Sequence, residues 1–192
     1  MYHQGNRDLQ DAFGSRALAD RLEATLRRTE FNEADGVFVA AQSFFFLATA
    51  DAEGRPDCSF KGGPPGFAQV VAPDELIFPD YDGNGMFKSL GNIAANPNVG
   101  LLFIAMGEKP QRLRVNGTAR VLRDDPRIAA IPGAQLLISV RPADIFPNCP
   151  RYIPSLQIVE PSIYMPKADT PPVEPAWKGF AAFADVVPPR VR

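Results

Sequence analysis

Apolar residues recur at helical spacing in the first part of the chain. The positions that share this spacing are Phe13, Ala17, Leu18, Leu22 and Leu26. Charged residues fill the gaps between them, which is typical of an amphipathic helix. A second short helix is expected to begin after Asn32, because asparagine is a favoured N-cap and acidic residues follow it. The sequence therefore predicts a helical segment over 1–42.

Beyond this segment the pattern changes to short aromatic and aliphatic runs separated by glycine, proline and aspartate. Such runs predict β-strands joined as hairpins. The predicted extended segments are 43–50, 56–61, 67–72, 75–78, 99–105, 111–123 and 135–140. A helix is expected over 83–96, and Pro97 stops it. Residues 124–126 are expected to open a short helix, with Pro126 in its first turn.

Hairpin spacing with few helices predicts a mainly β (α+β) protein built on six strands in a closed or nearly closed antiparallel barrel. A β-sandwich is the alternative. We expect one domain over 1–192, with the barrel at 43–146 and an irregular segment at 147–192. Seven of the 32 residues from Pro161 onward are proline. This end of the chain is expected to lie extended over the surface or over a partner subunit.

Composition and charge argue against several classes of function. The net charge is −2, and 45% of residues are hydrophobic, so no nucleic-acid partner is indicated. No apolar run approaches the ~20 residues that span a bilayer, and the first eight residues lack a signal-peptide pattern. We therefore expect no membrane association and a cytoplasmic location. The two cysteines, Cys58 and Cys149, form no metal-binding or redox motif.

Histidine is nearly absent from the chain. His3 is the only one, so Ser-His-Asp or Cys-His catalysis would lack its base, and a histidine-ligated metal site would lack its ligands. No metal is expected. The chain either performs no chemistry or depends on a cofactor for it.

The most specific local motif runs from 79 to 89, where a strand ends, two glycines follow and a helix begins. Lys88 and Ser89 fall in the first turns of that helix. Free amide groups, the helix dipole and a lysine together suit a phosphate group. Phe87 stands where a Walker loop needs glycine, which excludes that motif. An ordinary loop with a solvated lysine is the alternative.

Two further segments are candidate binding elements. Residues 57–66 lead from a strand into a glycine-rich corner, where another group can approach the backbone closely. Arg112 and Arg114 are two apart on one predicted strand and so face the same way. They suit an anion. The alternatives are a plain barrel corner and two solvated arginines.

Residues 44–122 resemble the pyridoxamine 5'-phosphate oxidase-like, FMN-binding split-barrel superfamily. The order and spacing of several short motifs carry the resemblance, at 46–51, 54–57, 61–62, 95–97, 99–103 and 113–117. Within it, the motifs at 61–67 and 148–153 are similar to those of predicted flavin-nucleotide-binding proteins. The resemblance implies a six-stranded antiparallel split β-barrel with FMN as cofactor.

The resemblance also implies where the flavin lies. It places residues 57–61 and 78–80 beside the ring, Lys88 and Ser89 at the phosphate, and Arg112 near the pyrimidine end. The full set of expected cofactor-binding residues is Asp57, Cys58, Ser59, Phe60, Lys61, Phe78, Pro79, Asp80, Asn84, Lys88, Ser89 and Arg112. Pro56 replaces a phosphate-binding arginine of the oxidases, which argues against pyridoxamine phosphate oxidation itself.

We expect an FMN-dependent oxidoreductase of unknown substrate. A non-catalytic flavin-binding, storage or sensing module is the alternative, and a split barrel holding haem or deazaflavin is a third. Haem is disfavoured because His3 is the only histidine. Cys149 and Arg151 would face a small-molecule substrate, or else be structural and surface residues.

A homodimer with the flavin at the subunit interface is expected. One barrel offers a flavin a single wall, whereas bound cofactors usually have most of their surface covered. The segment after 140 also carries apolar and aromatic side chains that are costly to leave in water, namely Phe146, Tyr152, Ile153, Tyr164 and Trp177.

Overall fold

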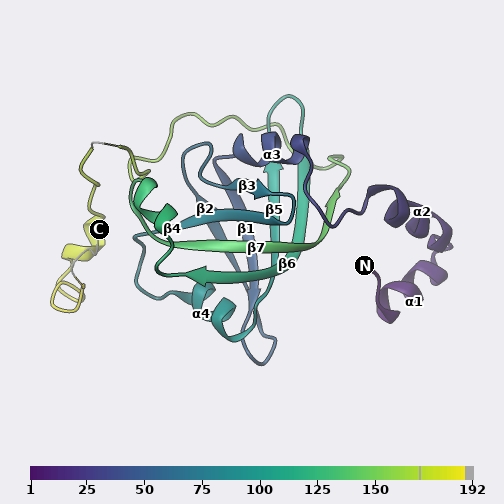
Figure 1. The fold of residues 1–192 in the computed structure, drawn as a ribbon, viewed down its shortest axis with the longest axis horizontal. Helices are drawn as coiled ribbons and strands as arrows, with labels where there is room; N and C mark the ends of the chain where they lie inside the picture. The colour runs from purple at the N-terminus through teal and green to yellow at the C-terminus, as the bar shows by residue number, and fades with distance from the viewer. Residues whose placement is uncertain (169, 189–192) are drawn as a thin grey trace.

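The computed structural model describes residues 1–168 and 170–188 (Figure 1). Three helices open the chain: α1 (Gln4–Ala12), α2 (Arg16–Leu26) and α3 (Glu33–Ala40). The predicted cap of α3 is confirmed, because the Asn32 side chain accepts a 2.9 Å hydrogen bond from the Asp35 amide. The Asp35 carboxylate in turn accepts one from the Asn32 amide at 3.0 Å. This reciprocal capping fixes where α3 begins.

The rest of the fold is one antiparallel sheet, which confirms a mainly β protein with several helices. Its strands are β1 (Phe44–Ala50), β2 (Pro56–Gly62), β3 (Gln69–Ala72), β4 (Glu75–Tyr81), β5 (Asn98–Ala105), β6 (Gln111–Leu122) and β7 (Ala134–Pro147). They are ordered β2-β1-β5-β6-β7-β4-β3. The prediction of a six-stranded barrel is wrong: each of the seven segments expected to be extended forms a strand, including the short β3, which pairs with β4. Among the described residues no ladder joins β2 to β3, so the sheet is open between its two edge strands.

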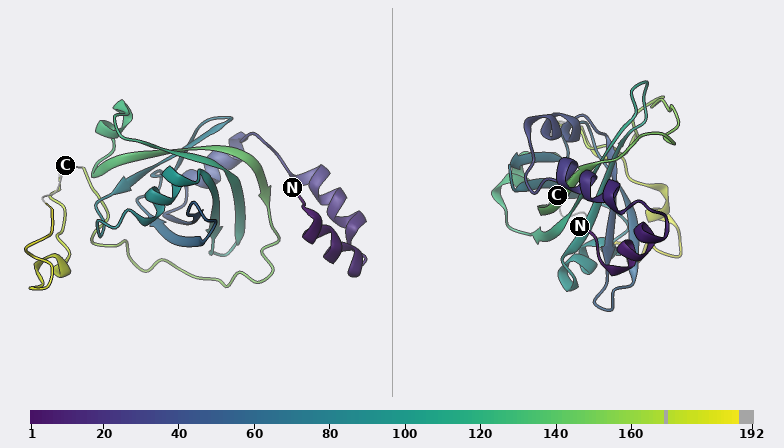
Figure 2. Two further views of the ribbon diagram at one scale, coloured as in Figure 1. Left: turned by 90° about the horizontal axis from the view of Figure 1, so that it is seen from below. Right: turned by 90° about the vertical axis from the view of Figure 1, so that its right-hand side faces the viewer.

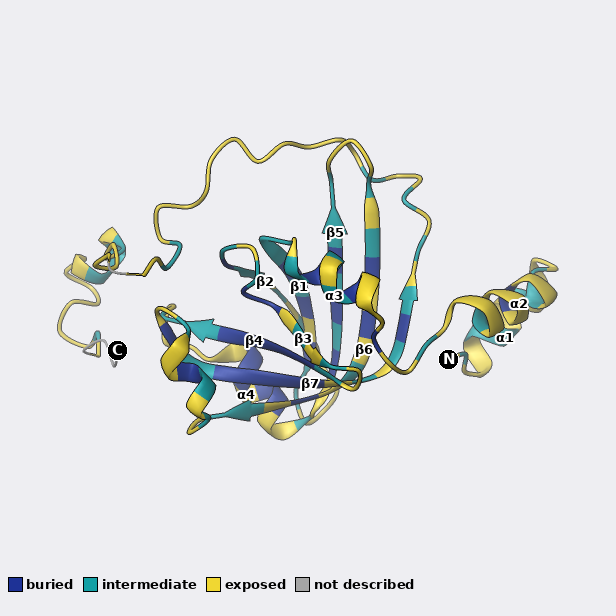
Figure 3. Cartoon of the chain, turned by 45° about the horizontal axis from the view of Figure 1, so that its top comes forward, coloured by how far each residue is buried: buried dark blue, intermediate teal, exposed yellow. Residues whose placement is uncertain are grey.

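Long strands let the sheet coil around its core. The first half of β7 pairs with both β4 and β6, and its second half continues along β6 alone. Strands β4 and β7 therefore run across the direction of β1 and β5 (Figure 3). The inner face is buried and aromatic, with the Phe45 ring 4.9 Å from that of Phe78 and 4.8 Å from that of Phe103.

Helix α4 (Lys88–Ala95) covers one end of the coiled sheet with Leu90 and Ile93. The predicted helix over 83–96 is too long at its start. Phe87 has a left-handed backbone with φ 46°, and Gly85 has φ 73°. A helix cannot run through these conformations, so the residues before Lys88 form a loop instead.

The chain ends lie on opposite sides of the sheet (Figure 2). Helices α1 and α2 form a hairpin that projects from one side, and the C-terminal segment with the short 3-10 helix η2 (Ala176–Gly179) lies on the other. Another short 3-10 helix, η1 (Pro126–Ala130), lies between β6 and β7. Among the described residues, no helix is both long and apolar enough to cross a membrane.

Candidate functional site

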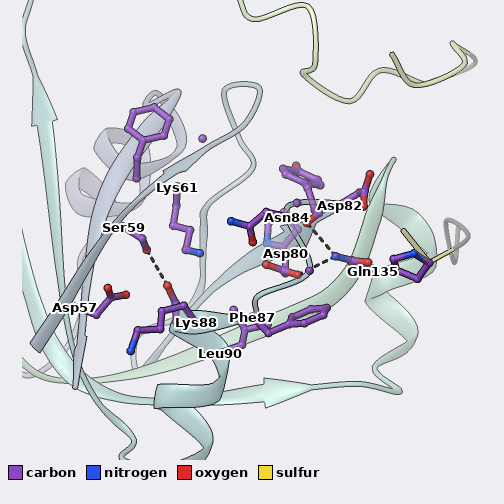
Figure 4. A pocket seen from close by; sticks show the side chains of 18 of the residues that line it. Asp57, Ser59, Lys61, Asp80, Asp82, Asn84, Phe87, Lys88, Leu90 and Gln135 are labelled. Carbon is purple, nitrogen blue, oxygen red and sulfur yellow. Dashed lines mark hydrogen bonds between the residues drawn. The ribbon is translucent and has the colours of Figure 1, made fainter. Parts of the chain in front are cut away.

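A cavity of about 650 Å³ opens between β2, the end of β4 and the start of α4. Figure 4 shows side chains from all three elements turned toward this space. The C-terminal segment contributes to its lining through Trp177, Lys178, Val187 and Pro188. The volume lies within the ~300–1,000 Å³ range of pockets that bind small organic molecules.

Strand β2 supplies three polar side chains to the cavity. Asp57, Ser59 and Lys61 alternate along the strand and so share one face. Their partners across the ladder are Thr49, Leu47 and Phe45, all of which face the core. The polar face of β2 therefore lies where the core opens toward solvent.

The Lys61 ammonium extends into the cavity without a hydrogen-bonding or ion-pair partner in the described part of the chain (Figure 4). Burial lowers the pKa of Lys61, while the negative charges of Asp80 and Asp57 act in the opposite direction. A half-buried cation of this kind attracts a negatively charged ligand group.

The start of α4 forms a second polar wall. Ser89 is buried, and its hydroxyl lies 2.9 Å from that of Ser59, which ties α4 to β2. Lys88 is exposed at the first position of the helix. Its neighbour Phe87 holds a strained left-handed conformation of the kind that concentrates at binding sites. The free amides of the first helical turn and the Lys88 ammonium can together hold an anion.

Strand β4 supplies a half-buried carboxylate on the other side of the cavity. Asp80 accepts a 3.1 Å hydrogen bond from Gln135 Nε2, which also donates to the Tyr81 carbonyl at 3.0 Å. Burial raises the pKa of Asp80, an effect that Gln135 and the Lys61 charge oppose. Burial also raises the pKa of Tyr81 to about 12. The phenol therefore stays neutral at physiological pH.

Replacing Asp80 with asparagine is expected to stabilise the fold more at pH 7 than at pH 4. A carboxyl whose pKa is raised on folding contributes stability at low pH, and this contribution is lost as the pH rises through the raised value. Asparagine does not titrate and can still accept from Gln135. Thermal unfolding of both proteins across this range measures the difference. A larger gain at pH 4 than at pH 7 would contradict the assigned burial effect.

The cavity brings together all of the expected cofactor-binding residues except two. Phe78 is 1% exposed and packs against Phe45 in the core; it shares a face of β4 with Asp80 but lies two residues farther from the end of the strand at which the cavity opens. Arg112 lies on the outer face of β6, where its Nε atom is buried without a hydrogen-bond partner. Cys149 and Arg151 are exposed beyond the end of β7 and do not line the cavity.

The lining residues that the sequence did not indicate as site residues include Gln135, Trp177 and Lys178. Gln135 was included only as the first residue of a predicted strand. Trp177 was noted only as an apolar side chain in need of cover. Gln135 and Lys178 are held in the site by hydrogen bonds to residues 54 to 96 positions away, which no local motif reveals.

A coiled antiparallel sheet with a helix start and a polar cavity at one end is the architecture of the split-barrel class. Residues 31–146 match the family described as pyridoxamine 5'-phosphate oxidase. The match spans more than half of the chain, so the protein belongs to the pyridoxamine 5'-phosphate oxidase-like superfamily. The motifs noted at 46–117 fall within it.

Several solved structures are similar to this chain at low sequence identity. HupZ from Group A Streptococcus is 16% identical with a TM-score of 0.49, covering 61% of this chain and 98% of that one. The haem storage protein HutZ from Vibrio cholerae is 19% identical with a TM-score of 0.41, covering 55% and 84%. An FMN-binding protein from Syntrophomonas wolfei is 10% identical with a TM-score of 0.45, covering 73% and 97%. Likeness at this level assigns no ligand, and no curated protein matches the sequence.

Proposed function

We propose that this protein binds FMN in the cavity between β2, β4 and α4 and acts as an FMN-dependent oxidoreductase. The observation that carries the proposal is one cavity of about 650 Å³ with a lysine and free helix amides at α4 and an unpartnered ammonium on β2. These groups suit a ligand with a phosphate at one end and a polar ring at the other. Family membership supports the same ligand.

The residues fit the parts of FMN as follows. Lys88 and the first amides of α4 would hold the phosphate, with the buried Ser89 fixed by Ser59. Lys61 would lie at the polar edge of the ring, where its charge favours negative charge on the ligand. Flavin, when bound, supplies hydride or electron transfer. The protein's own residues orient the ring and exclude water from one of its faces.

A reduction experiment separates an enzyme from a storage or sensing module. The FMN-loaded protein is mixed with NADH or NADPH without air, and absorbance is followed in the flavin bands. Bleaching followed by recovery in air, repeated over several cycles, is the result expected of an oxidoreductase. The storage or sensing alternative would be favoured by two results together. Neither NADH nor NADPH bleaches the flavin bands, and protein that dithionite has reduced does not pass its electrons onward.

We also propose that the functional unit is a homodimer, with the outer face of β1, β2, β5 and β6 as its interface. Aromatic and aliphatic side chains gather on this face, namely Phe44, Phe46, Phe60, Leu102 and Ile104. The Phe44 and Phe60 rings stack at 5.2 Å, yet Phe60 remains 63% exposed. Phe60 also lines the cavity, and Arg112 lies on the same outer face. A second copy here would therefore reach the flavin site.

Light scattering tests the proposed dimer. The wild-type protein is expected at twice the 20.9 kDa chain mass, because an exposed aromatic face is stabilised by burial. Phe60→Glu places a charge in that face and should give the monomer mass. Val37→Glu is the matched control, since Val37 is 68% exposed on α3. A wild-type monomer with FMN bound, or a dimer that persists in Phe60→Glu, would contradict the interface.

A further inference from the structure

The C-terminal segment lies at the mouth of the cavity rather than along the sheet. Trp177, Lys178, Val187 and Pro188 line the same space as β2, β4 and α4. Almost 100 residues separate Lys178 from the loop after β4 that it meets. The cavity is therefore walled by two parts of the chain, one of them outside the region that matches the family.

An ion pair attaches this segment to the rim of the cavity. Lys178 Nζ lies 2.6 Å from Asp82 Oδ2, and the Lys178 side chain is only 13% exposed. Glu174 Oε2 lies 3.4 Å from the same ammonium. Lys178 is thus held between a carboxylate of its own segment and one on the loop that follows β4.

The segment has internal structure that can position an aromatic ring. Trp177 makes an edge-to-face contact with Phe183, with 6.2 Å between ring centroids and an angle of 78°. Backbone hydrogen bonds of 2.8 Å from Phe183 to Phe180 and 3.0 Å from Val187 to Phe183 close successive turns. Trp177 is therefore fixed within a small folded unit while it lines the cavity.

We propose that residues 174–188 are the lid of the flavin site, in which Trp177 covers the ring of the ligand and the Lys178–Asp82 ion pair holds the lid closed. This inference rests on the proposed FMN binding. An indole face can stack on a planar ring, and a closed lid keeps water from it. Breaking this ion pair would let the lid open for the ligand to enter and leave.

Tryptophan fluorescence gives a direct readout, because Trp177 is the only tryptophan in the chain. FMN is titrated into the full-length wild-type protein while tryptophan and flavin emission are followed together. We expect tryptophan emission to be quenched in proportion to bound FMN. Trp177→Ala should weaken FMN binding by roughly 2- to 10-fold, whereas Trp177→Phe should stay near wild type.

The latch is tested by Lys178→Gln and Asp82→Asn. Each is expected to speed FMN release and to expose Trp177 to acrylamide in the unliganded protein. The double variant should do no more than Lys178→Gln alone, because that change already removes the ion pair with Asp82. Lys167→Gln, an exposed charge change in the same tail, is the matched control and should behave as wild type.

The outcomes separate the lid from the proposed function. Saturable FMN binding without tryptophan quenching, and with unchanged affinity in Trp177→Ala, would overturn the lid and leave the FMN site standing. Additive effects of Lys178→Gln and Asp82→Asn would overturn the ion pair as the latch. A wild-type protein that binds no FMN would overturn the FMN site and the flavin lid together.

Discussion

Lys88→Ala is expected to raise the dissociation constant for FMN by about 10- to 150-fold. Lys88 is the first residue of α4, beside the free amides of the helix start and the rim of the cavity. A hydrogen bond to a charged group contributes roughly 1.5–3 kcal/mol, which converts to this range of affinity. A fluorescence titration of each variant with FMN measures the effect.

Riboflavin provides the ligand control for this prediction, because it has the same ring without the phosphate. Lys88→Ala should change riboflavin binding far less than FMN binding. Lys109→Ala is the protein control, since this lysine is exposed in the loop between β5 and β6 and does not line the cavity. Equal losses for both ligands, or an unchanged FMN affinity, would remove Lys88 from the phosphate site.

Gly117→Ala is expected to destabilise the fold by more than about 3 kcal/mol, a large fraction of the ~5–15 kcal/mol that holds a domain folded. A Cβ atom at Gly117 would lie 2.0 Å from the Arg141 carbonyl oxygen and 3.0 Å from the Pro142 Cα. Both are backbone atoms of β7, so no side-chain rotation relieves the overlap. Relief requires separating β6 from β7 at the irregularity between Asn116 and Gly117.

The same substitution at Gly91 should stabilise the fold rather than destabilise it. Gly91 lies inside α4 with nothing within 4 Å of the added Cβ. Alanine in a helix interior stabilises by roughly 0.5–1 kcal/mol relative to glycine. Denaturant unfolding of the two variants gives both values. Similar stabilities for Gly117→Ala and Gly91→Ala would contradict the close approach of β6 and β7.

Sequence patterns located the strands but missed how far one of them runs. β7 extends to Pro147, seven residues past the predicted end at 140. Pro142 and Pro147 argue against a sheet strand because proline donates no ladder hydrogen bond. Pro142 is tolerated because it faces Gly117 at the register shift, where the ladder is already irregular. Only the pairing partner reveals this.

In the candidate site, too, residues within continuous motifs could be predicted from the sequence, whereas residues brought in by tertiary contacts could not. The segments 57–61 and 79–89 were found from the sequence because each is a continuous motif, and the cavity brings them together. Phe78 departs from the expectation because it packs inside the core, two residues before the end of β4 at which the cavity opens. Arg112 departs from the expectation because it lies on the outer face of β6, whereas the cavity is lined by other elements. Gln135, Trp177 and Lys178 reach the site through the coil of the sheet and the path of the tail.

Calorimetric titration of FMN into the flavin-free, full-length protein tests the central claim most directly. The cavity between β2, β4 and α4 predicts a saturable heat with one FMN bound per chain, weakened in Lys88→Ala and retained in Lys109→Ala. The titration needs no assumption about substrate or electron donor. The absence of saturable heat at every FMN concentration that stays in solution would contradict the account.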